Sequence, residues 1–456
     1  MKHNLIVFAI ISLIAVSCGI KNYQPVEVSE KDSLIRESAS ADTTNISSIG
    51  WKSFYADPYL QALINEGLAN NIDLKVALYR IDQAAAYYKK SKGALYPSLS
   101  AGASATFNGN YRGATAGELY NFGVSASWEI DIWGRIRNAK KAKYAELLAQ
   151  QGSKNAIITQ LIANIAQSYY ALVAFDTQKK LVEETIRNRT DYYQTVKALK
   201  ESAQVNEVAV LQAQAQLCEA QGYIPSIHNA IRIMENSICY LLGKVPGPIT
   251  RETTESIQDI NITDPPLGVS SQLLQNRPDV LAAEKTVMSY HYNLRSAKAA
   301  MYPALKLTGN TGLDATELKS WFNITSAAWN LAAGLAQPIF NGRALRTQKE
   351  VAYYQYEQAV LNFKSSVLNA GMEVSNAMSQ ISTNAELAKY KYKQYMALGK
   401  AYEFSVDLLV NGYATYLDVL TAQNGVFNAQ MAFISTVQEY YNAKIELYRA
   451  LGGGWR

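Results

Sequence analysis

The residue types that carry most enzymatic and metal chemistry are scarce in this chain. Its 456 residues include three histidines and three cysteines. His228 and His291 lie far apart in the sequence and have no neighbouring cysteines or paired carboxylates, so they predict no metal site. No glycine-rich phosphate loop and no Gly-x-Ser-x-Gly nucleophile motif is present. The sequence therefore predicts a protein that is not an enzyme, with no catalytic residues and no cofactor.

Cys18 is the cysteine whose surroundings indicate a chemical modification. Residues 1–17 combine Lys2, a short apolar run and small residues, which is typical of a signal peptide that is removed. The stretch Ala15-Val16-Ser17-Cys18-Gly19 resembles a bacterial lipoprotein cleavage box, although the commonest form has leucine where Ala15 stands. We therefore expect lipidation of Cys18, with an ordinary signal peptide as the alternative. The polar residues 18–48 are expected to form a lipidated linker without regular structure.

The rest of the chain contains an internal repeat. Tyr96-Pro97-Ser98-Leu99 recurs as Tyr302-Pro303-Ala304-Leu305 at an offset of 206, and Leu242-Gly243 recurs as Leu451-Gly452 at an offset of 209. Such a long repeat with little drift indicates a duplicated structural unit, whose halves we expect to intertwine in one body. The predicted division is a first repeat at 49–244, a crossover in an equatorial region at 245–272 and a second repeat at 273–456.

Each repeat contains two segments that alternate with a period of two, which predicts β-strands with one apolar and one polar face. The hairpins are expected at about 97–132 and about 303–338. Alternation by itself favours a soluble sandwich, but the strands are long enough to cross a hydrocarbon core and the chain has a signal peptide. Four strands cannot close a barrel around a pore, and lipid does not tolerate an open edge, so several chains must share one barrel.

Long helices follow the hairpins. Residues 135–200 and 343–410 contain no proline, and each stretch would extend about 100 Å as one helix. Val360, Val367, Val374 and Ile381 stand at seven-residue spacing, the pattern of a coiled-coil seam. A shorter helix returns in each repeat, so the helical ranges are about 135–243 and about 343–451. Pro225 is expected to kink or break the first returning helix.

The two turns between long and returning helices differ. Gly412 marks the second turn, and Thr415-Tyr416-Leu417-Asp418 resembles a capping box with Asp418 in the third helical position. In the first repeat, the counterparts of Gly412 and Asp418 are Ala203 and Ala209. The two tips are therefore not equivalent.

Several motifs occur in an order that a known family shares. They are Arg277-Pro278-Asp279-Val280, Tyr302-Pro303, Pro338-Ile339-Phe340-Asn341-Gly342-Arg343 and Leu417-Asp418-Val419-Leu420. From Trp51 to Leu451 the chain resembles the TolC-type outer-membrane efflux channels, specifically the lipoprotein branch that serves resistance-nodulation-division pumps. The resemblance implies an α+β membrane protein. It would be a homotrimer with a shared twelve-stranded β-barrel, four strands from each chain, continued by a long α-helical coiled-coil barrel.

The resemblance also implies a function. The protein would be lipid-anchored in the cell outer membrane and extend into the periplasm. It would be the passive exit duct of a tripartite efflux pump for drugs or other small molecules, with a periplasmic adaptor protein and an inner-membrane pump as partners.

The resemblance places the channel gate near the start of the last helix. Spacing from the turn glycine assigns the gate to Leu417, Asp418 and Thr421, with Gly412 as the tip hinge. Three Asp418 carboxylates would form a ring that favours cations. Relatives carry an aspartate where Thr421 stands, so a second ring is not expected here. The alternative is that Asp418 only caps its helix. The turn at 202–206 is expected to contact the adaptor.

Two other functions compete with an efflux duct. A duct for type I protein secretion would share the fold and the gate. A lipid-anchored periplasmic coiled-coil scaffold would instead bury Phe122, Trp128 and Ile130 in a soluble core. Nucleic acid is not an expected partner, because the net charge is only +5 and no run of lysine and arginine is present.

Overall fold

The computed structural model describes residues 23–26, 49–109, 115–251 and 276–455. The expected signal peptide, Cys18 and most of the linker and crossover lie outside these residues. The chain forms two compact units. Unit 1 includes Tyr79–Gly152 and Leu281–Ser365, and unit 2 includes Ser153–Val280 and Ser366–Arg456. Each unit thus combines segments of both repeats, as expected for intertwined halves.

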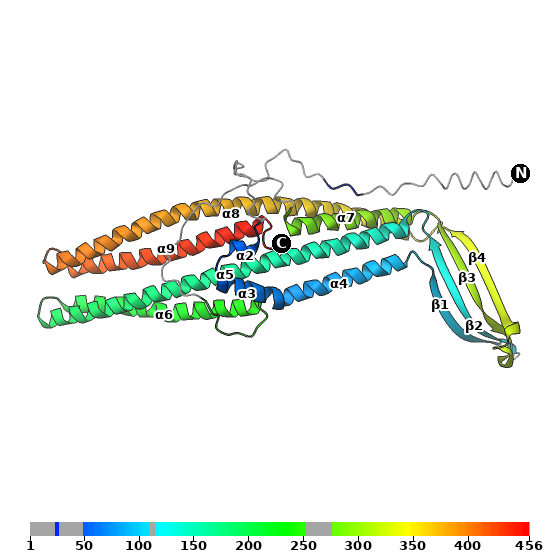
Figure 1. The fold of residues 1–456 in the computed structure, drawn as a ribbon, viewed down its shortest axis with the longest axis horizontal. Helices are drawn as coiled ribbons and strands as arrows, with labels where there is room; N and C mark the ends of the chain where they lie inside the picture. Colours follow the sequence, from blue (N-terminus) through cyan, green and yellow to red (C-terminus); the bar gives the residue numbers. More distant parts are fainter. Residues whose placement is uncertain (1–22, 27–48, 110–114, 252–275, 456) are drawn as a thin grey trace. The chain divides into compact units, whose positions relative to one another are not determined.

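The helices of the first repeat return in the second with the same lengths (Figure 1). Positions 72 and 278, where two of them begin, lie 206 residues apart, and positions 207 and 416 lie 209 apart, the same offsets as the sequence motifs. The short helices α2 (Trp51–Phe54) and α3 (Pro58–Asn70) precede the repeating set. That set consists of α4 (Ile72–Gly93) and α7 (Pro278–Ala299) with 22 residues each, α5 (Arg135–Glu201) and α8 (Ala344–Val410) with 67 each, and α6 (Glu207–Leu241) and α9 (Tyr416–Ala450) with 35 each.

Pro225 lies inside α6, which continues past it, so a break at this residue is not observed. A proline in a helix interior removes a backbone hydrogen bond and crowds the preceding turn. Packing offsets this cost, because Ile227 is buried together with Val182 of α5 and Ile224 packs against the same cluster. Tertiary contacts supply most helical stability in proteins, and here they outweigh the local preference.

The strands form one antiparallel sheet in the order β1-β2-β3-β4. Val124 pairs with Ala101 on one side and Thr311 on the other, and Thr311 pairs with Trp329. This register places the apolar face predicted for each strand on the same side of the sheet. Among the described strands, β1 and β4 each pair along one edge only. The four strands are β1 (Ser98–Gly109), β2 (Thr115–Ile130), β3 (Ala304–Ala315) and β4 (Ala327–Ala336).

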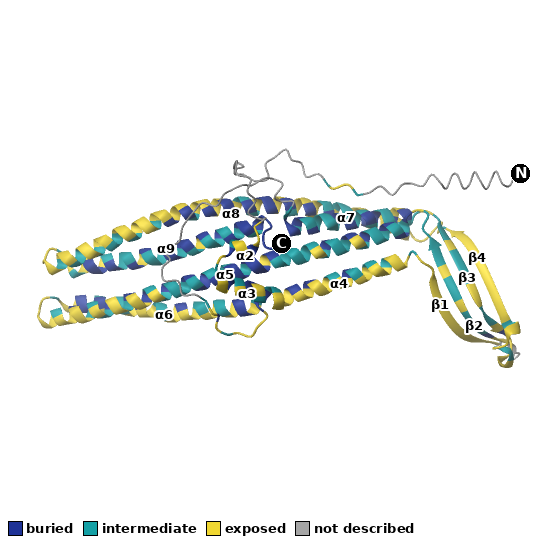
Figure 2. Cartoon of the chain, viewed as in Figure 1, coloured by how far each residue is buried: buried dark blue, intermediate teal, exposed yellow. Residues whose placement is uncertain are grey.

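The largest hydrophobic core lies in unit 2, where α3, α5, α8 and α9 meet. The predicted coiled-coil seam is part of it, since Val374 and Ile381 are buried together with Ile165 of the first repeat. Figure 2 shows buried positions along α5, α8 and α9. In the described part of the chain, α5 is the one helix with a window apolar enough to cross a membrane, but half of that window is buried within the protein. The apolar character of α5 therefore serves packing.

Two equivalent joints hold the ends of the returning helices in unit 2. In the first repeat, Asn71 donates from Nδ2 to the carbonyl oxygen of Leu241 at 2.9 Å. In the second, Arg277 donates from Nη1 to the carbonyl oxygen of Ala450, also at 2.9 Å. Gly243 and Gly452 follow these helices with φ of +68° and +81°. A Cβ on Gly452 would lie 3.0 Å from the carbonyl oxygen of Asn276, so the close approach requires glycine.

Candidate functional site

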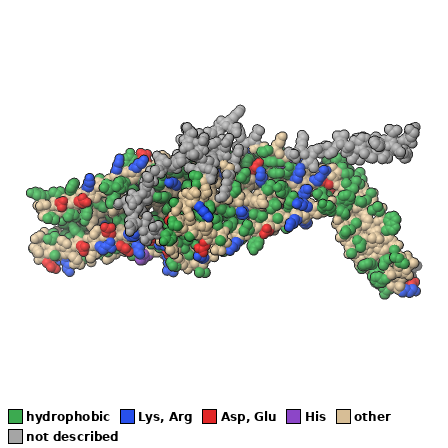
Figure 3. All heavy atoms as spheres, in the orientation of Figure 1, with side chains coloured by type: hydrophobic (Ala, Val, Ile, Leu, Met, Phe, Trp, Pro, Cys, Tyr) green, Lys and Arg blue, Asp and Glu red, His purple; other side chains and the backbone are tan. Residues whose placement is uncertain are grey.

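The sheet in unit 1 exposes the apolar face that the alternation predicted. Trp329 is 81% exposed, Leu99 is 75% exposed and Phe122 is 44% exposed. Hydrophobic side chains gather over the strands in the space-filling view (Figure 3). A continuous apolar face of this kind requires a cover of lipid or protein. The scaffold alternative required Phe122, Trp128 and Ile130 to lie in a soluble core, but Phe122 is exposed, and Trp128 and Ile130 are half-buried.

The opposite face of the sheet is polar and small. Ser100 and Ser125 hydrogen-bond across β1 and β2 at 2.6 Å, and Asn121 donates to Asp314 across β2 and β3. A hollow of about 460 Å³ opens on this part of the sheet and is lined mainly by small and polar residues, among them Asn310. The sheet therefore separates an apolar side from a polar side, as the wall of a water-filled passage through lipid must.

The exit from β2 fixes the start of α5. Asp131 accepts hydrogen bonds from the backbone nitrogens of Ile136 and Arg137, at 3.0 and 2.8 Å. Glu129 accepts two hydrogen bonds from Arg135, from Nε and Nη2, both at 2.8 Å. Negative charge at a helix N-terminus is stabilised by the free backbone N–H groups and the helix dipole. The carboxylates of the strand end thus attach the sheet to the long helix.

The tip in the second repeat has the predicted capping box. Asp418 accepts a hydrogen bond from the backbone nitrogen of Thr415 at 2.7 Å, and the Thr415 hydroxyl lies 2.6 Å from the same carboxylate oxygen. These bonds from Thr415 lower the pKa of the Asp418 carboxyl. Leu417, Asp418 and Thr421 are all exposed at the start of α9, and Gly412 occupies the turn with φ of +77°. Asp418 is therefore charged and fixed in orientation.

The tip in the first repeat is built differently. Asn206 caps α6, with its side-chain oxygen 3.2 Å from the backbone nitrogen of Ala209. Ala203 has a φ of +57°, the left-handed conformation that Gly412 adopts at the matching position. Ala209 is fully buried, whereas its counterpart Asp418 is exposed. The sequence predicted that the tips differ, and the structure shows that one matching position packs and the other faces solvent.

Hydrogen bonds connect the two tips within unit 2. Tyr416 donates from its hydroxyl to Oε1 of Gln212 on α6 at 2.9 Å. Tyr192 of α5 donates to the carbonyl oxygen of Tyr416 at 3.1 Å. Tyr416 directly precedes Leu417 and Asp418, so these two bonds tie the start of α9 to both helices of the first repeat. Spacing and composition gave no indication of either bond.

Arg189 is a second feature that sequence reasoning missed. It lies on α5, and its side chain is 1% exposed. It donates to the carbonyl oxygen of Gln216 at 2.5 Å and to Asn424 at 2.6 Å, and it forms an ion pair with Glu219 at 3.3 Å. Val182 and Val196, seven residues to either side, are also buried. The internal repeat could have indicated that Arg189 is buried, because its counterpart in the second repeat is the apolar Leu398.

The Arg277-Pro278-Asp279 motif forms an ion network in unit 2. Arg277 pairs with Asp279 at 2.7 Å and with Glu373 of α8 at 2.8 Å. Arg449 of α9 reaches the same Glu373 oxygen at 3.0 Å. Burial raises the pKa of Glu373, but the charges of Arg277 and Arg449 lower it by a larger amount, so the net shift is downward. The motif is thus a structural clamp between the start of α7, α8 and α9.

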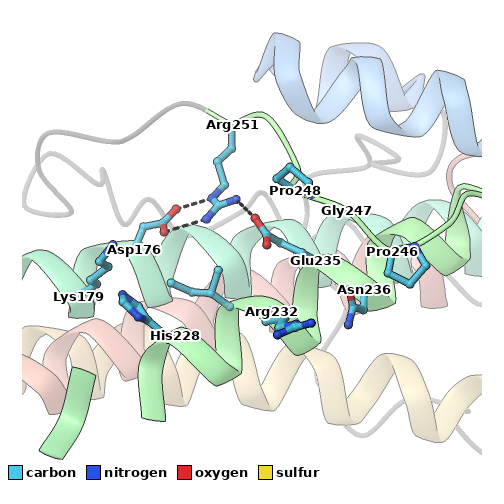
Figure 4. Close-up of a pocket in the computed structure, with 11 residues that line it drawn as sticks. Asp176, Lys179, His228, Arg232, Glu235, Asn236, Pro246, Gly247, Pro248 and Arg251 are labelled. Carbon is cyan, nitrogen blue, oxygen red and sulfur yellow. Dashed lines mark hydrogen bonds and ion pairs between the residues drawn. The ribbon is translucent and has the colours of Figure 1, made fainter. Parts of the chain in front are cut away.

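A second clamp lies beside a hollow of about 440 Å³ in unit 2 (Figure 4). Arg251 donates to both carboxylate oxygens of Asp176 on α5 and, at 2.7 Å, to Glu235 on α6. The guanidinium therefore fastens the chain that follows α6 back onto both helices. His228 lines the same hollow. Among the described residues, no group of three or more histidines, cysteines and carboxylates is placed to hold a metal ion.

Relatives of known function place this architecture among efflux proteins. "Cation efflux system protein CusC" of Escherichia coli is 29% identical over 90% of both chains. "Probable outer membrane lipoprotein SilC" of Salmonella typhimurium is 26% identical over 94% of both chains. "Toluene efflux pump outer membrane protein TtgI" of Pseudomonas putida is 28% identical over 89% of this chain and 87% of its own length.

The fold leads to the same group of proteins. A crystal structure of CusC superposes with a TM-score of 0.86 and 27% identity, covering 94% of this chain and 99% of its own. The sequence model of the family described as "Outer membrane efflux protein" matches residues 63–244 and 269–453, which is most of the chain and includes both repeats. An apolar sheet face, a polar opposite face and two long helical hairpins are thus the parts of an efflux channel, and the chain belongs to the outer membrane efflux protein family.

Proposed function

We propose that this protein is the passive exit duct of a tripartite efflux pump and carries drugs or other small molecules across the periplasm and the outer membrane. The observation that carries the proposal is the two-faced sheet, with Trp329, Leu99 and Phe122 exposed on one side and hydrogen-bonded serines on the other. No catalytic group is assigned to the chain, and the energy for transport comes from its partners.

Three copies of the chain share one barrel in this proposal. The free edges of β1 and β4 support it, because lipid does not tolerate unpaired backbone groups at a sheet edge. Pairing β4 of one copy with β1 of the next removes both edges and gives twelve strands in a homotrimer. The exit from β4 also favours an intermolecular contact, since Phe340 is 90% exposed next to a fully exposed Ile339.

The gate of the duct is assigned to Leu417, Asp418 and Thr421, with Gly412 as the hinge of the tip. These three side chains are exposed on the first turns of α9. The capping box does not exclude a gate, because it uses one carboxylate oxygen of Asp418 and leaves the charge in place. A ring of three such carboxylates attracts cations. Mutual repulsion between the carboxylates also raises the proton affinity of each of them.

The partners are a periplasmic adaptor protein and an inner-membrane pump. The turn at 202–206 is assigned to the adaptor, because it differs from the gate-bearing turn in its cap and carries no counterpart of the exposed Asp418 carboxylate. The acyl group on Cys18 would hold the protein in outer-membrane lipid. The cleavage-box residues around Cys18 and the lipoprotein name of SilC support this assignment.

Single-channel conductance in planar bilayers tests the duct and its gate. The purified wild-type protein is expected to show a small, cation-preferring conductance. Asp418→Ala should alter the conductance and weaken the cation preference. Asp407→Ala removes another exposed carboxylate near the same tip and serves as the matched control. Folded trimers without any conductance, in the wild type and in Asp418→Ala alike, would argue against an open duct.

A further inference from the structure

The short N-terminal segment 23–26 contacts the folded part of unit 1. The backbone nitrogen of Tyr23 donates a hydrogen bond to the hydroxyl of Tyr292 on α7 at 3.3 Å. The ring of Tyr23 meets His291 edge to face, with 5.6 Å between centroids and 67° between planes. Tyr23 and Tyr292 lie 269 positions apart in the sequence. The chain therefore contacts helix α7 at a position only five residues after Cys18.

His291 is the centre of an aromatic cluster that Tyr23 joins, formed with Tyr292 and Tyr356. Its ring lies 5.4 Å from Tyr292 and 5.8 Å from Tyr356 of α8, both in edge-to-face arrangements. Edge-to-face pairs at such distances are favourable beyond the area they bury. Burial lowers the pKa of His291, and Arg295 and Lys298 lower it further. The imidazole is therefore neutral at pH 7 and packs as an aromatic ring.

Tyr23 is likewise held in its uncharged form. Burial raises the pKa of its hydroxyl to about 12, with Glu284 adding to the effect. The neighbouring Gln24 is exposed. One side chain of the segment thus packs against the aromatic cluster while the next is exposed to solvent, which is the arrangement of a docked anchor residue.

We infer that Tyr23 is a docking residue that fastens the N-terminal segment to the aromatic cluster of His291, Tyr292 and Tyr356, and that this docking confines the acyl group of Cys18 to the sheet-bearing unit. The docking of Tyr23 is supported by its own contacts with this cluster. The consequence for the acyl group rests on the lipidation proposed above.

The length of chain between Cys18 and its first fixed residue determines how strongly docking confines the acyl group. Without docking, the tether runs the 33 positions from Cys18 to Trp51, the first residue of α2, and a random coil of that length would span about 30 Å. From Tyr23 the tether has five residues and spans about 12 Å. The effective concentration of a tethered group falls with roughly the three-halves power of tether length, so docking raises that of the lipid about 17-fold near its anchor point.

The aromatic cluster lies close enough to the sheet end of α7 to hold a membrane anchor there. Tyr292 precedes Ala299, the last residue of α7, by seven residues, or about 10 Å along the helix. Strand β3 begins shortly afterwards at Ala304. Five residues of extended chain reach about 18 Å at most. The acyl group therefore stays within reach of the end of α7 from which the sheet starts.

Photocross-linking of the full-length protein in outer-membrane vesicles tests the docking directly. A benzophenone amino acid replaces Tyr23 in one sample and Gln24 in the matched control. The probe at position 23 should label the tryptic peptide Thr286–Arg295, which contains His291 and Tyr292, several-fold more strongly than the probe at position 24. Equal labelling from both positions, or labelling elsewhere only, overturns the proposal.

Limited trypsin digestion of the same vesicles gives a second readout at Lys21. Tyr23→Ala should speed cleavage after Lys21 by up to about tenfold, the change expected from losing edge-to-face packing. Tyr23→Phe keeps the ring and the backbone donor and should cleave like the wild type, as should Gln24→Ala. An unchanged rate in Tyr23→Ala contradicts docking.

A Cys18→Ser variant separates the docking from the lipidation. If the cross-link persists in this variant, docking is independent of the lipid. If mass spectrometry finds no acyl group on the wild-type N-terminal peptide while the cross-link is present, the proposed lipidation is wrong and the docking stands. If the acyl group is present without the cross-link, the docking is wrong and the lipidation stands.

Discussion

Arg189 on α5 donates a hydrogen bond from Nη2 to Oδ1 of Asn424 on α9, at 2.6 Å, and so joins helices of the two repeats through a buried guanidinium. The ring of Phe427, one turn further along α9, lies 5.3 Å from the same group. The start of α9, where the gate is assigned, is therefore connected to α5 by a buried charged group.

Removing the acceptor should loosen this connection. Asn424→Ala leaves a buried charged donor without its partner, and hydrogen bonds to charged groups contribute about 1.5–3 kcal/mol. We expect Asn424→Ala to lose its helical circular dichroism signal in detergent at a lower temperature than the wild type. Arg189→Leu copies Leu398 of the second repeat and should be less harmful than Arg189→Ala, which leaves a cavity. Equal losses in the two Arg189 variants would contradict this packing argument.

The charge and the cap at Asp418 can be separated by two substitutions. Asp418→Asn keeps an acceptor for Thr415 and removes the charge, so cation preference in planar bilayers should fall while the helix start stays intact. Thr415→Val removes the hydroxyl and keeps the charge, so cation preference should remain. If only Thr415→Val changes the selectivity, the carboxylate acts as a cap and not as a gate.

The pH dependence of the gate follows from the same carboxylate. The hydrogen bonds from Thr415 lower the pKa of Asp418, so the charge should persist below the ordinary value of about 3.9. Cation preference is then constant from pH 7 to pH 5 and is lost only as the pH falls through the lowered pKa. Loss that begins near pH 6 would show that repulsion within a ring of carboxylates outweighs the cap.

The two tip turns should respond to substitution with opposite signs. Ala203 adopts a left-handed backbone that costs an alanine about 1–2 kcal/mol. Ala203→Gly should therefore slow hydrogen exchange of the turn amides slightly, since glycine avoids this strain but loses more chain entropy. Gly412→Ala introduces the strain and should speed exchange in its turn. The same sign in both turns would contradict the backbone argument.

Close approach of strands predicts a sensitive glycine in the sheet. A Cβ on Gly312 would clash with the carbonyl oxygen of Phe122 and lie 2.6 Å from the Cα of Gly123. Overpacking of this kind costs about 1–3 kcal/mol, so Gly312→Ala should reduce the amount of folded protein in outer-membrane fractions. Gly102 lies in the same cross-strand row but has open space around it, so Gly102→Ala is the matched control.

The clamp of the Arg277 motif should depend on pH. The folded state lowers the pKa of Glu373 below its ordinary value of about 4.3, so its contribution is complete above that value and is lost as the pH falls through the lowered pKa. Thermal stability should drop below about pH 4 in the wild type. Glu373→Gln should be less stable at pH 7 and should show a smaller drop. A drop of equal size in both proteins would assign the acid sensitivity to other groups.

Local patterns in the sequence were enough to predict most of the elements. The alternation at Phe122, Val124 and Trp128 predicted one strand with an apolar face, and the seven-residue spacing through Val374 predicted the seam of α8. The order of motifs identified the family. These predictions succeeded because side-chain period and helix length are properties of neighbouring residues, and the internal repeat supplied each pattern twice. The roles of Leu417, Asp418, Thr421 and Cys18 remain predictions.

Other features required the tertiary structure. The sequence determined the strands, the long helices, the tip turns and the duplicated plan of this protein. Only the folded chain decided that Arg189 meets Asn424, that Tyr416 reaches Gln212 and that the ring of Tyr23 packs against His291. Each of these contacts joins residues far apart in sequence, and side chains of the same types elsewhere face solvent. Burial and partner geometry, which no local pattern encodes, therefore select which polar residue becomes a connection between helices.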